Sequence, residues 1–406
     1  MTRAPSIRGR PLPNAEETAP PPLRNGPWRL SAVALDVAGA CNLSCRYCAE
    51  TATQPRRERM SAKTLNAAWR MLFPEGTPWR GSSIRLGSGE PLLAFDLLKR
   101  LAELIAQNGG CAAEDRPAVF LTSNGTLAGK EVRDWLVTSG WHVKLSLDGP
   151  SFIHDRWRVT RSGKGTFSQV SAAVEELASR MPDRFSVTAV LCRGTDPKVA
   201  FQAIADLGLR RIELVPAAHR DESILPGRKE LKLYQRFVND YARQYRDARE
   251  TKLPTLVRFE ACVQRILGYN RCRVPCGAGR NFVGVGPGGD LYPCFRFVGI
   301  DTYRLGHLPD GLDSHAVSIF EQGAGRGYEQ RTPCKRCWAA PLCGGPCFAV
   351  AEMFGKSPGA SLEVHCGYTR ATIKSAQWLV DQLRLRDPQS LLKFLPEAVK
   401  AQWAVE

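Results

Sequence analysis

The sequence has no long hydrophobic run. Nowhere in its 406 residues does an apolar stretch approach the length of a membrane span. The N-terminal residues 1–26, MTRAPSIRGRPLPNAEETAPPPLRNG, also lack the apolar core of a signal peptide. These absences argue against a membrane protein, and we expect a soluble protein of the cytoplasm. The sequence contains no internal repeat either.

The excess of positive charge is not concentrated in one part of the sequence. Lys and Arg number 56 against 40 Asp and Glu, which gives a formal net charge of +16, and such an excess is one signature of a nucleic-acid partner. The basic residues are nevertheless spread along the chain, with Pro55–Arg59 as the densest cluster, and no stacking-aromatic motif accompanies them. A solvated basic surface explains this pattern better than nucleic-acid binding. An acidic peptide or an anionic cofactor would be attracted by the same field.

Cysteine, by contrast, is abundant. The chain contains 14 cysteines. The cytoplasm keeps thiols reduced, which disfavours a disulfide framework. We therefore interpret most of these cysteines as ligands of metals or clusters.

Hydrophobic periodicity predicts alternating strands and helices. The predicted strands are Leu30–Val37, Ser83–Leu86, Ala118–Leu121, Val143–Leu147, Phe185–Leu191 and Ile212–Val215. Amphipathic helical stretches lie between them, and the first of these has Ser61 as its predicted N-cap. Six strands that alternate with helices predict an α/β protein with a parallel sheet. Periodicity alone leaves open whether the sheet is doubly wound or forms a barrel-like (β/α)6 arc.

Composition divides the chain into five segments. They are a disordered leader over 1–28, an α/β domain over 29–227, a bridging helical region over 228–271, a cysteine-rich domain over 272–370 and C-terminal helices over 371–406. The cysteine-rich segment has few periodic apolar residues, so its core needs support from metal ligation. Near the C-terminus we expect a helix over Tyr368–Arg386 and a shorter one around Leu391–Trp403.

Three cysteines lie close together directly after the first predicted strand, in the stretch CNLSCRYC. Cys41, Cys45 and Cys48 can hold three irons of a [4Fe–4S] cube and leave the fourth iron without a protein ligand. The spacing, with Tyr47 before the last cysteine, resembles the signature of the radical S-adenosylmethionine (SAM) superfamily. The resemblance implies that the open iron binds SAM, whose reductive cleavage gives a 5′-deoxyadenosyl radical. A zinc site is the alternative, but zinc normally takes four ligands.

Three further motifs end the next predicted strands in order: LGSGEP (Leu86–Pro91), TSNGT (Thr122–Thr126) and SLDGP (Ser146–Pro150). They resemble the segments with which this superfamily binds SAM, although Ser88 stands where the first motif has a glycine. The resemblance implies SAM contacts by Tyr47, Gly89, Glu90, Ser123, Asn124 and Ser146. Their order at consecutive strand ends favours a partial, TIM-like (β/α)6 barrel over a doubly wound sheet.

The remaining grouped cysteines resemble the SPASM domain, which binds two auxiliary [4Fe–4S] clusters. The resemblance implies that Cys276, Cys294 and Cys347 bind the first auxiliary cluster. It assigns the second cluster to Cys334, Cys337, Cys343 and Cys366, so that the chain would hold three clusters in all. Cys272 is the candidate fourth ligand of the first auxiliary cluster; without it, that cluster has an open iron for substrate. Cys111, Cys192 and Cys262 match no motif, and we expect them to be buried as small hydrophobic residues.

Auxiliary clusters indicate oxidative chemistry, because a substrate radical must lose an electron and a chain of clusters gives that electron a route. The segments IHDRWR and GKGTF resemble members that act on peptides and proteins. We therefore predict a radical SAM oxidoreductase that crosslinks or similarly modifies a ribosomally made precursor peptide. The alternative is an anaerobic sulfatase maturase that forms formylglycine. Such relatives carry Asp after the cysteine that matches Cys294, whereas this chain has Phe295, which cannot accept a proton.

The predicted partners follow from this chemistry. They are a precursor peptide with an acidic leader and an electron donor such as flavodoxin or ferredoxin. The residues before the first strand cannot form a core, so leader binding falls to the barrel or SPASM surface or to a separate protein. No catalytic residue is assigned from the sequence, and Asp148, Glu213 and Asp290 are weak candidates for a general base.

A cysteine-rich zinc protein that binds nucleic acid is the alternative from another class. It explains the charge and the paired cysteines but not the ordered motifs at the strand ends. Protein purified without oxygen should be brown, contain iron and release 5′-deoxyadenosine from SAM after reduction. A colourless zinc protein whose DNA binding falls steeply with salt would contradict this interpretation.

Overall fold

The computed structural model describes residues 7–9, 30–49, 58–73, 81–107, 116–247, 253–269, 273–332, 334–354, 361–396, 400 and 403–405. No helix within these ranges combines the length and the apolar character that crossing a membrane requires. The predicted leader lies largely outside the described residues. Its described part, β1 (Ile7–Gly9), pairs antiparallel with β13 (Trp403–Val405) at the other end of the chain.

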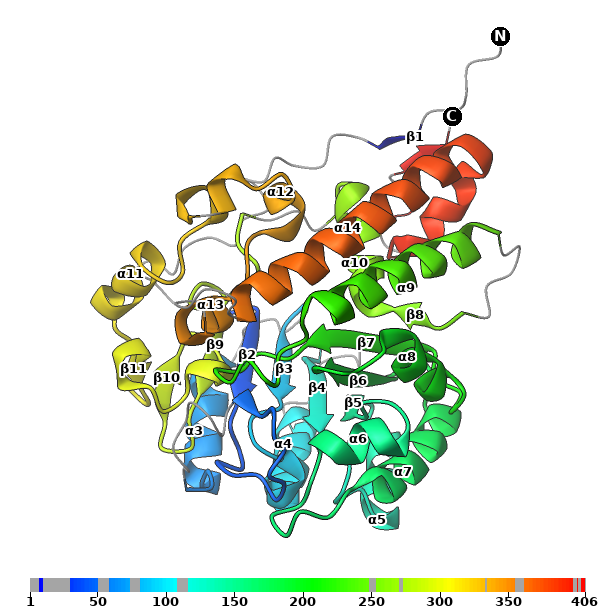
Figure 1. Cartoon of the computed structure of the whole chain (residues 1–406). Coiled ribbons are helices and arrows are strands. Elements are labelled where there is room, and N and C mark those ends of the chain that lie inside the picture. The colour runs from blue at the N-terminus through cyan, green and yellow to red at the C-terminus, as the bar shows by residue number, and fades with distance from the viewer. Residues whose placement is uncertain are drawn as a thin grey trace.

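The centre of the fold is a sheet that contains six neighbouring parallel strands. They are β2 (Ala32–Leu35), β3 (Ser83–Leu86), β4 (Ala118–Ser123), β5 (His142–Ser146), β6 (Phe185–Leu191) and β7 (Arg211–Pro216). Their spatial order equals their order in the chain, and the two-residue strand β8 (Thr255–Leu256) continues it. A doubly wound sheet reverses its strand order at a switch point, and this sheet does not. The predicted partial (β/α)6 barrel is therefore confirmed (Figure 1).

The six βα units are completed by helices that follow each strand. They are α3 (Ala62–Leu72), α4 (Phe95–Gln107), α5 (Lys130–Thr138), α6 (Ser151–Trp157) with α7 (Phe167–Arg180), α8 (Pro197–Ala205) and α9 (Arg228–Asp247). The predicted N-cap is confirmed, because the Ser61 side chain accepts a hydrogen bond from the Thr64 backbone N–H. Each strand lies within two residues of its predicted bounds at either end. Local sequence patterns thus specified the barrel well.

The cysteine-rich region extends the same sheet. Strand β9 (Phe282–Val285) pairs parallel with β2, and β10 (Asp290–Tyr292), β11 (Gly306–His307) and β12 (Gly311–Leu312) follow as antiparallel neighbours. Helix α10 (Val257–Ile266) precedes this region, and short helices complete it: α11 (Ser314–Gln322), α12 (Ala340–Cys343) and α13 (Phe348–Phe354). The barrel and the cysteine-rich region therefore share one eleven-stranded sheet.

Helix α14 (Ser361–Arg386) is the long C-terminal helix that runs beside α9 in Figure 1. It begins seven residues before the predicted Tyr368, so the expected boundary at residue 370 lies inside the helix. The predicted helix around Leu391–Trp403 is matched only in part by its described residues, among which Lys400 is helical. The other described residues include the 3₁₀ helix η7 (Pro388–Phe394) and strand β13, whose pairing with β1 favours an extended backbone from Trp403.

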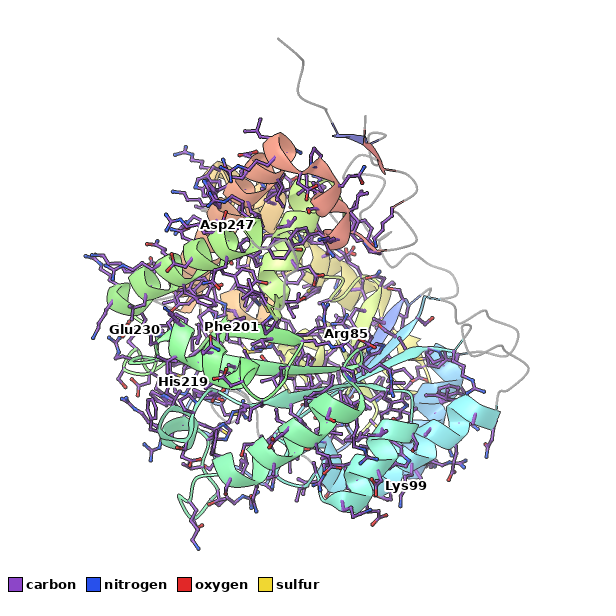
Figure 2. The ribbon with its side chains drawn as sticks, turned by 90° about the vertical axis from the view of Figure 1, so that its right-hand side faces the viewer. Arg85, Lys99, Phe201, His219, Glu230 and Asp247 are labelled. Carbon is purple, nitrogen blue, oxygen red and sulfur yellow. The ribbon has the colours of Figure 1, made fainter. Side chains whose placement is uncertain are left out.

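Helices α8, α9 and α14 pack through aromatic side chains. The rings of Phe201 on α8 and Phe237 on α9 are 5.2 Å apart, and Figure 2 shows Phe201 beneath α9, whose two ends are marked by Glu230 and Asp247. Tyr234 on α9 stacks on Tyr368 of α14 with ring centroids 4.3 Å apart. Its hydroxyl is 2.9 Å from the hydroxyl of Thr372. A buried aromatic interface therefore fixes α14, which carries Cys366, against the barrel.

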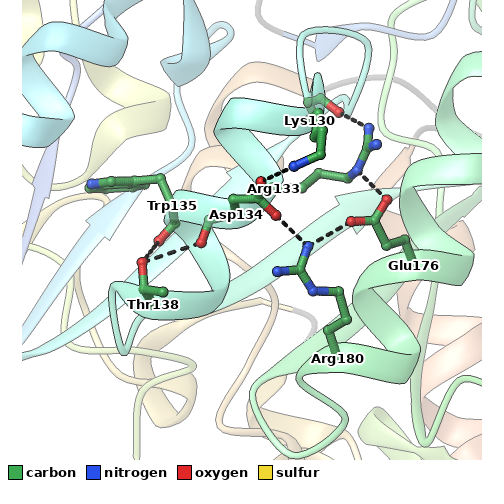
Figure 3. Close-up of polar contacts among 8 residues, drawn as sticks. Lys130, Arg133, Asp134, Trp135, Thr138, Glu176 and Arg180 are labelled. Atoms are coloured by element: carbon green, nitrogen blue, oxygen red, sulfur yellow. Dashed lines mark hydrogen bonds and ion pairs between the residues drawn. The ribbon is translucent and has the colours of Figure 1, made fainter.

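A polar network joins α5 and α7 on the outer surface (Figure 3). Arg180 contacts Asp134 and Glu176 at 2.7 Å each, and Arg133 contacts Glu176 at 2.7 Å. Lys130 pairs with Asp134 one helical turn away. Because these side chains lie in or near solvent, the network orients two helices but contributes little to stability compared with the apolar core.

Two leucines on α14 test this view of its packing. Leu379 is fully buried and Leu385 is 70% exposed. Leu379→Ala should lower the free energy of unfolding by about 2–5 kcal/mol, because it leaves a cavity in the core. Leu385→Ala should change it by less than about 0.5 kcal/mol. Chemical denaturation monitored by circular dichroism measures both, and equal losses would contradict the described packing of α14.

Candidate functional site

The loop that carries Cys41, Cys45 and Cys48 follows β2 at the carboxyl ends of the parallel strands. The three thiols are partly buried. Burial is the main reason why the pKa of the Cys41 thiol rises to about 11, and the negative charges of Glu90, Cys45 and Cys48 act in the same direction. The three sulfur atoms are therefore close enough to repel one another once ionised. A cationic centre bound to all three would relieve this repulsion.

One side of this loop is held by the segment that follows α6. Ser44 N–H donates to the Val159 carbonyl at 2.8 Å, and Arg46 N–H donates to the Trp157 carbonyl at 2.9 Å. Arg161 donates from its guanidinium to the Cys41 carbonyl at 2.8 Å. The IHDRWR segment and the residues after it thus run along one side of the cysteine loop and are hydrogen-bonded to it, and we call them the strip.

The other side is held by the LGSGEP segment. The Glu90 backbone N–H donates to the Ala40 carbonyl at 2.9 Å. Gly89 has a positive φ of 58°, and a Cβ atom on it would lie 2.2 Å from the Ala40 oxygen. Only glycine fits this close approach of two backbones. Ser88, which replaces the glycine of the motif, is buried.

The Glu90 carboxylate connects the ends of β3 and β4. It accepts hydrogen bonds from the Ser123 hydroxyl at 2.8 Å and from the Asn124 backbone N–H at 2.7 Å. It also accepts one from the Leu92 N–H at 3.0 Å. Burial raises the pKa of Glu90, and these donors oppose the shift. The carboxylate is therefore a fixed part of the site and not a mobile surface group.

Asn124 brings this network to the first cysteine. Its side-chain amide donates to the Asn42 side-chain oxygen at 2.9 Å and lies 3.6 Å from the Cys41 sulfur. The structure thus places the predicted SAM contacts Glu90, Ser123 and Asn124 in one group beside Cys41. Ser146, another predicted contact, is buried at the end of β5.

A buried ion pair lies beneath the loop. The Asp148 carboxylate accepts a hydrogen bond from the Tyr47 hydroxyl at 2.6 Å and from Arg158 Nε at 3.1 Å, and its other oxygen accepts one from the Val190 N–H at 2.9 Å. The Arg158 guanidinium lies 5.4 Å from the centre of the Tyr47 ring. Burial raises the pKa of the Cys45 thiol, and Arg158 opposes that shift. The sequence analysis did not identify Arg158. The sequence feature that could have indicated it is its position as the second arginine of IHDRWR, shortly after the SLDGP motif that contains Asp148.

The three candidate general bases are all paired with other groups. Asp148 accepts hydrogen bonds from Tyr47, Arg158 and the Val190 backbone. Glu213 on β7 contacts Lys144 at 2.6 Å and Arg258 at 3.4 Å, and these cations lower its pKa although burial acts in the opposite direction. Asp290 lies 3.0 Å from His307 and 3.5 Å from Arg304. We therefore assign none of them as the base.

The C-terminal cysteines influence one another's ionisation in two sets. Burial raises the pKa of Cys294, and the charges of Cys347 and Cys276 raise it further. Burial also raises the pKa of Cys366 to about 11, and the charge of Cys343 contributes in the same direction, as do those of Cys334 and Cys337. The thiols of each set that the SPASM resemblance implies thus influence one another's charge state, and their role as cluster ligands stays a prediction.

The other cysteines have simpler outcomes. Cys272 and Cys111 lie outside the described residues. Cys192 and Cys262 are buried, as expected. Within the described ranges, no set of three or more cysteines is arranged as a metal site. Thiolates are nevertheless the soft donors that suit iron–sulfur clusters or zinc.

Comparison with known proteins relates the chain to one superfamily. Residues 36–200 match the radical SAM superfamily model. A cysteine-type anaerobic sulfatase-maturating enzyme of Clostridium novyi (strain NT) is 21% identical over 334 residues, which cover 78% of this chain and 87% of that enzyme. The PqqA peptide cyclase of Xanthomonas euvesicatoria pv. vesicatoria (strain 85-10) is 27% identical over 305 residues, which cover 71% and 72%.

Two solved structures have a similar fold. The structure of anSMEcpe with bound AdoMet matches with a TM-score of 0.70 and 21% identity over 89% of this chain and 98% of that one. Streptococcus suis SuiB bound to precursor peptide SuiA matches with a TM-score of 0.55 and 18% identity over 83% and 76%. The shared fold thus extends well beyond residues 36–200 and includes the cysteine-rich region.

Gly89 provides a test of the site's geometry. Gly89→Ala should strain the left-handed backbone by about 1–2 kcal/mol and push it away from Ala40, so that SAM-dependent release of 5′-deoxyadenosine falls at least about tenfold. Gly129→Ala is the matched control, because nothing lies within 4 Å of the added methyl group. Chromatography of the anaerobic reaction measures the product. Equal release by both variants would show that the close approach at Ala40 is unimportant.

Proposed function

Since residues 36–200 of this chain belong to the radical SAM superfamily, we propose that it oxidatively modifies a ribosomally made precursor peptide. One observation carries the proposal. The loop with Cys41, Cys45 and Cys48 is held between the Gly89 backbone and the strip after α6, with the predicted SAM contacts beside it. Three thiolates held in this way leave one position of an iron–sulfur cube for a ligand that the protein does not supply.

In the proposed arrangement Cys41, Cys45 and Cys48 bind a [4Fe–4S] cluster. When bound, this cluster and SAM supply a 5′-deoxyadenosyl radical. The Glu90 carboxylate is suited to the methionyl ammonium because it is a buried acceptor at the strand ends. Ser123 and Asn124 orient that carboxylate through their hydrogen bonds. Tyr47, fixed by Asp148, and Ser146 complete the proposed SAM contacts.

The C-terminal cysteines are proposed to hold two auxiliary clusters. Cys276, Cys294 and Cys347 form one set, with Cys272 as the candidate fourth ligand. Cys334, Cys337, Cys343 and Cys366 form the other. The mutual influence of these thiols on their pKa values supports both sets. An oxidative reaction needs such centres, because a substrate radical must give up one electron to become a closed-shell product.

A peptide substrate is supported by the named relatives. The PqqA peptide cyclase matches 71% of this chain, and SuiB was solved with its precursor peptide SuiA. The positive net charge of this chain favours an acidic leader on the peptide. Flavodoxin or ferredoxin is the proposed class of electron donor, and a separate leader-binding protein is a further proposed partner.

Formylglycine formation in a sulfatase is the second candidate, because sulfatase-maturating enzymes are among the relatives. The anSMEcpe structure has also been solved with the Cp18Cys peptide. The residue after Cys294 weighs against this candidate. Phe295 begins the 3₁₀ helix η3 (Phe295–Phe297) and has no group that can accept a proton. We therefore rank peptide maturation above it.

Mass spectrometry of a co-expressed peptide tests the proposal. The chain is expressed with a candidate precursor peptide chosen from the short reading frames that neighbour its gene, and a loss of two hydrogens from the peptide is expected. The matched control replaces Cys41, Cys45 and Cys48 with alanine and should leave the peptide unchanged. A second sample contains a cysteine peptide from a sulfatase, with aldehyde detected by a hydrazide reagent. Aldehyde formation there, with an unchanged precursor, would overturn the proposal in favour of the second candidate.

A further inference from the structure

A surface pocket of about 240 Å³ lies next to the set of four C-terminal cysteines. Helix α9, helix α14 and the turn after Cys337 form it, and its lining residues are Leu231, Gln235, Trp338, Gly367, Arg370, Ala371 and Lys374. Trp338 directly follows Cys337, and Gly367 directly follows Cys366. Two walls of the pocket are therefore continuous with the backbone of two proposed cluster ligands.

Trp338 is an unusual surface residue. It is 54% exposed, although a tryptophan ring is one of the largest apolar groups a protein can bury. The Lys374 ammonium lies 5.7 Å from the centre of its ring. Exposed aromatic side chains that stand beside cations are typical of contact surfaces, because tryptophan and arginine often dominate binding energy there.

The charge around the pocket has one sign. Arg370 and Lys374 line it, and the described residues of its lining include no carboxylate. Lys335 and Arg336, both exposed, precede Cys337 on the same turn. Arg370 lies one helical turn after Cys366 on α14. Positive charge is thus concentrated where the four-cysteine set approaches the surface.

We propose that this basic surface, formed by Trp338, Arg370, Lys374, Lys335 and Arg336, is the docking site of an acidic one-electron carrier protein. The inference rests on the proposed function, in which the substrate radical gives up one electron. Cys334, Cys337, Cys343 and Cys366 would hold the proposed cluster, which would supply a redox centre that passes on the electron given up by the substrate radical, so that the substrate would be oxidised and the carrier reduced. No bond forms or breaks, and no proton moves between the proteins.

The location favours a carrier over the precursor peptide. Helix α12 and the middle of α14 lie in the upper part of Figure 1, whereas α6, which precedes the strip backing the Cys41 loop, lies in the lower part. A peptide to be modified must reach the Cys41 loop, but a carrier needs only the nearest exposed centre. Redox complexes also have small interfaces guided by charge, and a compact basic patch around one aromatic ring fits that description.

Charge reversal at the pocket tests the proposal. The reconstituted holoenzyme is titrated calorimetrically with an acidic flavodoxin at low and high salt. Arg370→Glu with Lys374→Glu should weaken binding at least about tenfold and remove most of its salt dependence. Trp338→Ala should weaken binding while the salt dependence remains. Lys63→Glu with Lys198→Glu is the matched control, since both lysines are exposed on other helices, and it should bind nearly as well as the unmodified enzyme.

Further measurements separate the possible failures. Iron content and circular dichroism should not change in the pocket variants, and Arg370→Lys should restore most of the binding if charge is responsible. Release of 5′-deoxyadenosine with dithionite as reductant should equal that of the unmodified enzyme, because a chemical reductant needs no docking site. Its absence in every form would overturn the proposed function and not the docking site. Unchanged flavodoxin affinity in the charge-reversed variant, or loss of affinity only for an acidic peptide, would overturn the docking proposal.

Discussion

The buried Asp148 carboxylate is the constraint on which the site depends. It is fully buried and receives hydrogen bonds from the Tyr47 hydroxyl, Arg158 and the Val190 backbone. One carboxylate thereby links the cysteine loop, strand β6 and the residue that ends α6. A buried charge that loses its partner is costly, so these elements hold one another in place. The same arrangement puts the positive charge of Arg158 near Cys45, where it favours the thiolate.

A second constraint comes from the shared sheet. Strand β9 pairs directly with β2, the strand that leads into the Cys41 loop. The cysteine-rich region is thus attached directly to the first barrel strand. Helix α14 carries Cys366 and is fixed against α9 by Tyr234 and Tyr368. The three sets of thiols therefore belong to one scaffold, which suits a reaction in which an electron must pass between centres.

Local patterns in the sequence predicted the barrel strands, the Ser61 cap and the motifs at the strand ends, because each depends on residues close together in the chain. The grouping of the C-terminal cysteines was predicted only from the resemblance to the SPASM domain. The contacts of Arg158 and the close approach of Gly89 to Ala40 were not predicted, since they join residues far apart in the sequence. The strand at the end of the chain was missed because its pairing with β1 overrides local helix propensity, and the earlier start of α14 was not predicted.

The central claim is that the Cys41, Cys45 and Cys48 loop holds an iron–sulfur cluster with one iron open to SAM. Electron–nuclear double resonance on the reduced enzyme, with SAM labelled by ¹⁵N in its amino group and ¹⁷O in its carboxylate, tests this claim most directly. The account predicts magnetic coupling of both labels to the cluster, and loss of that coupling when the three cysteines are replaced with alanine. A cluster signal without coupling to either label would contradict it.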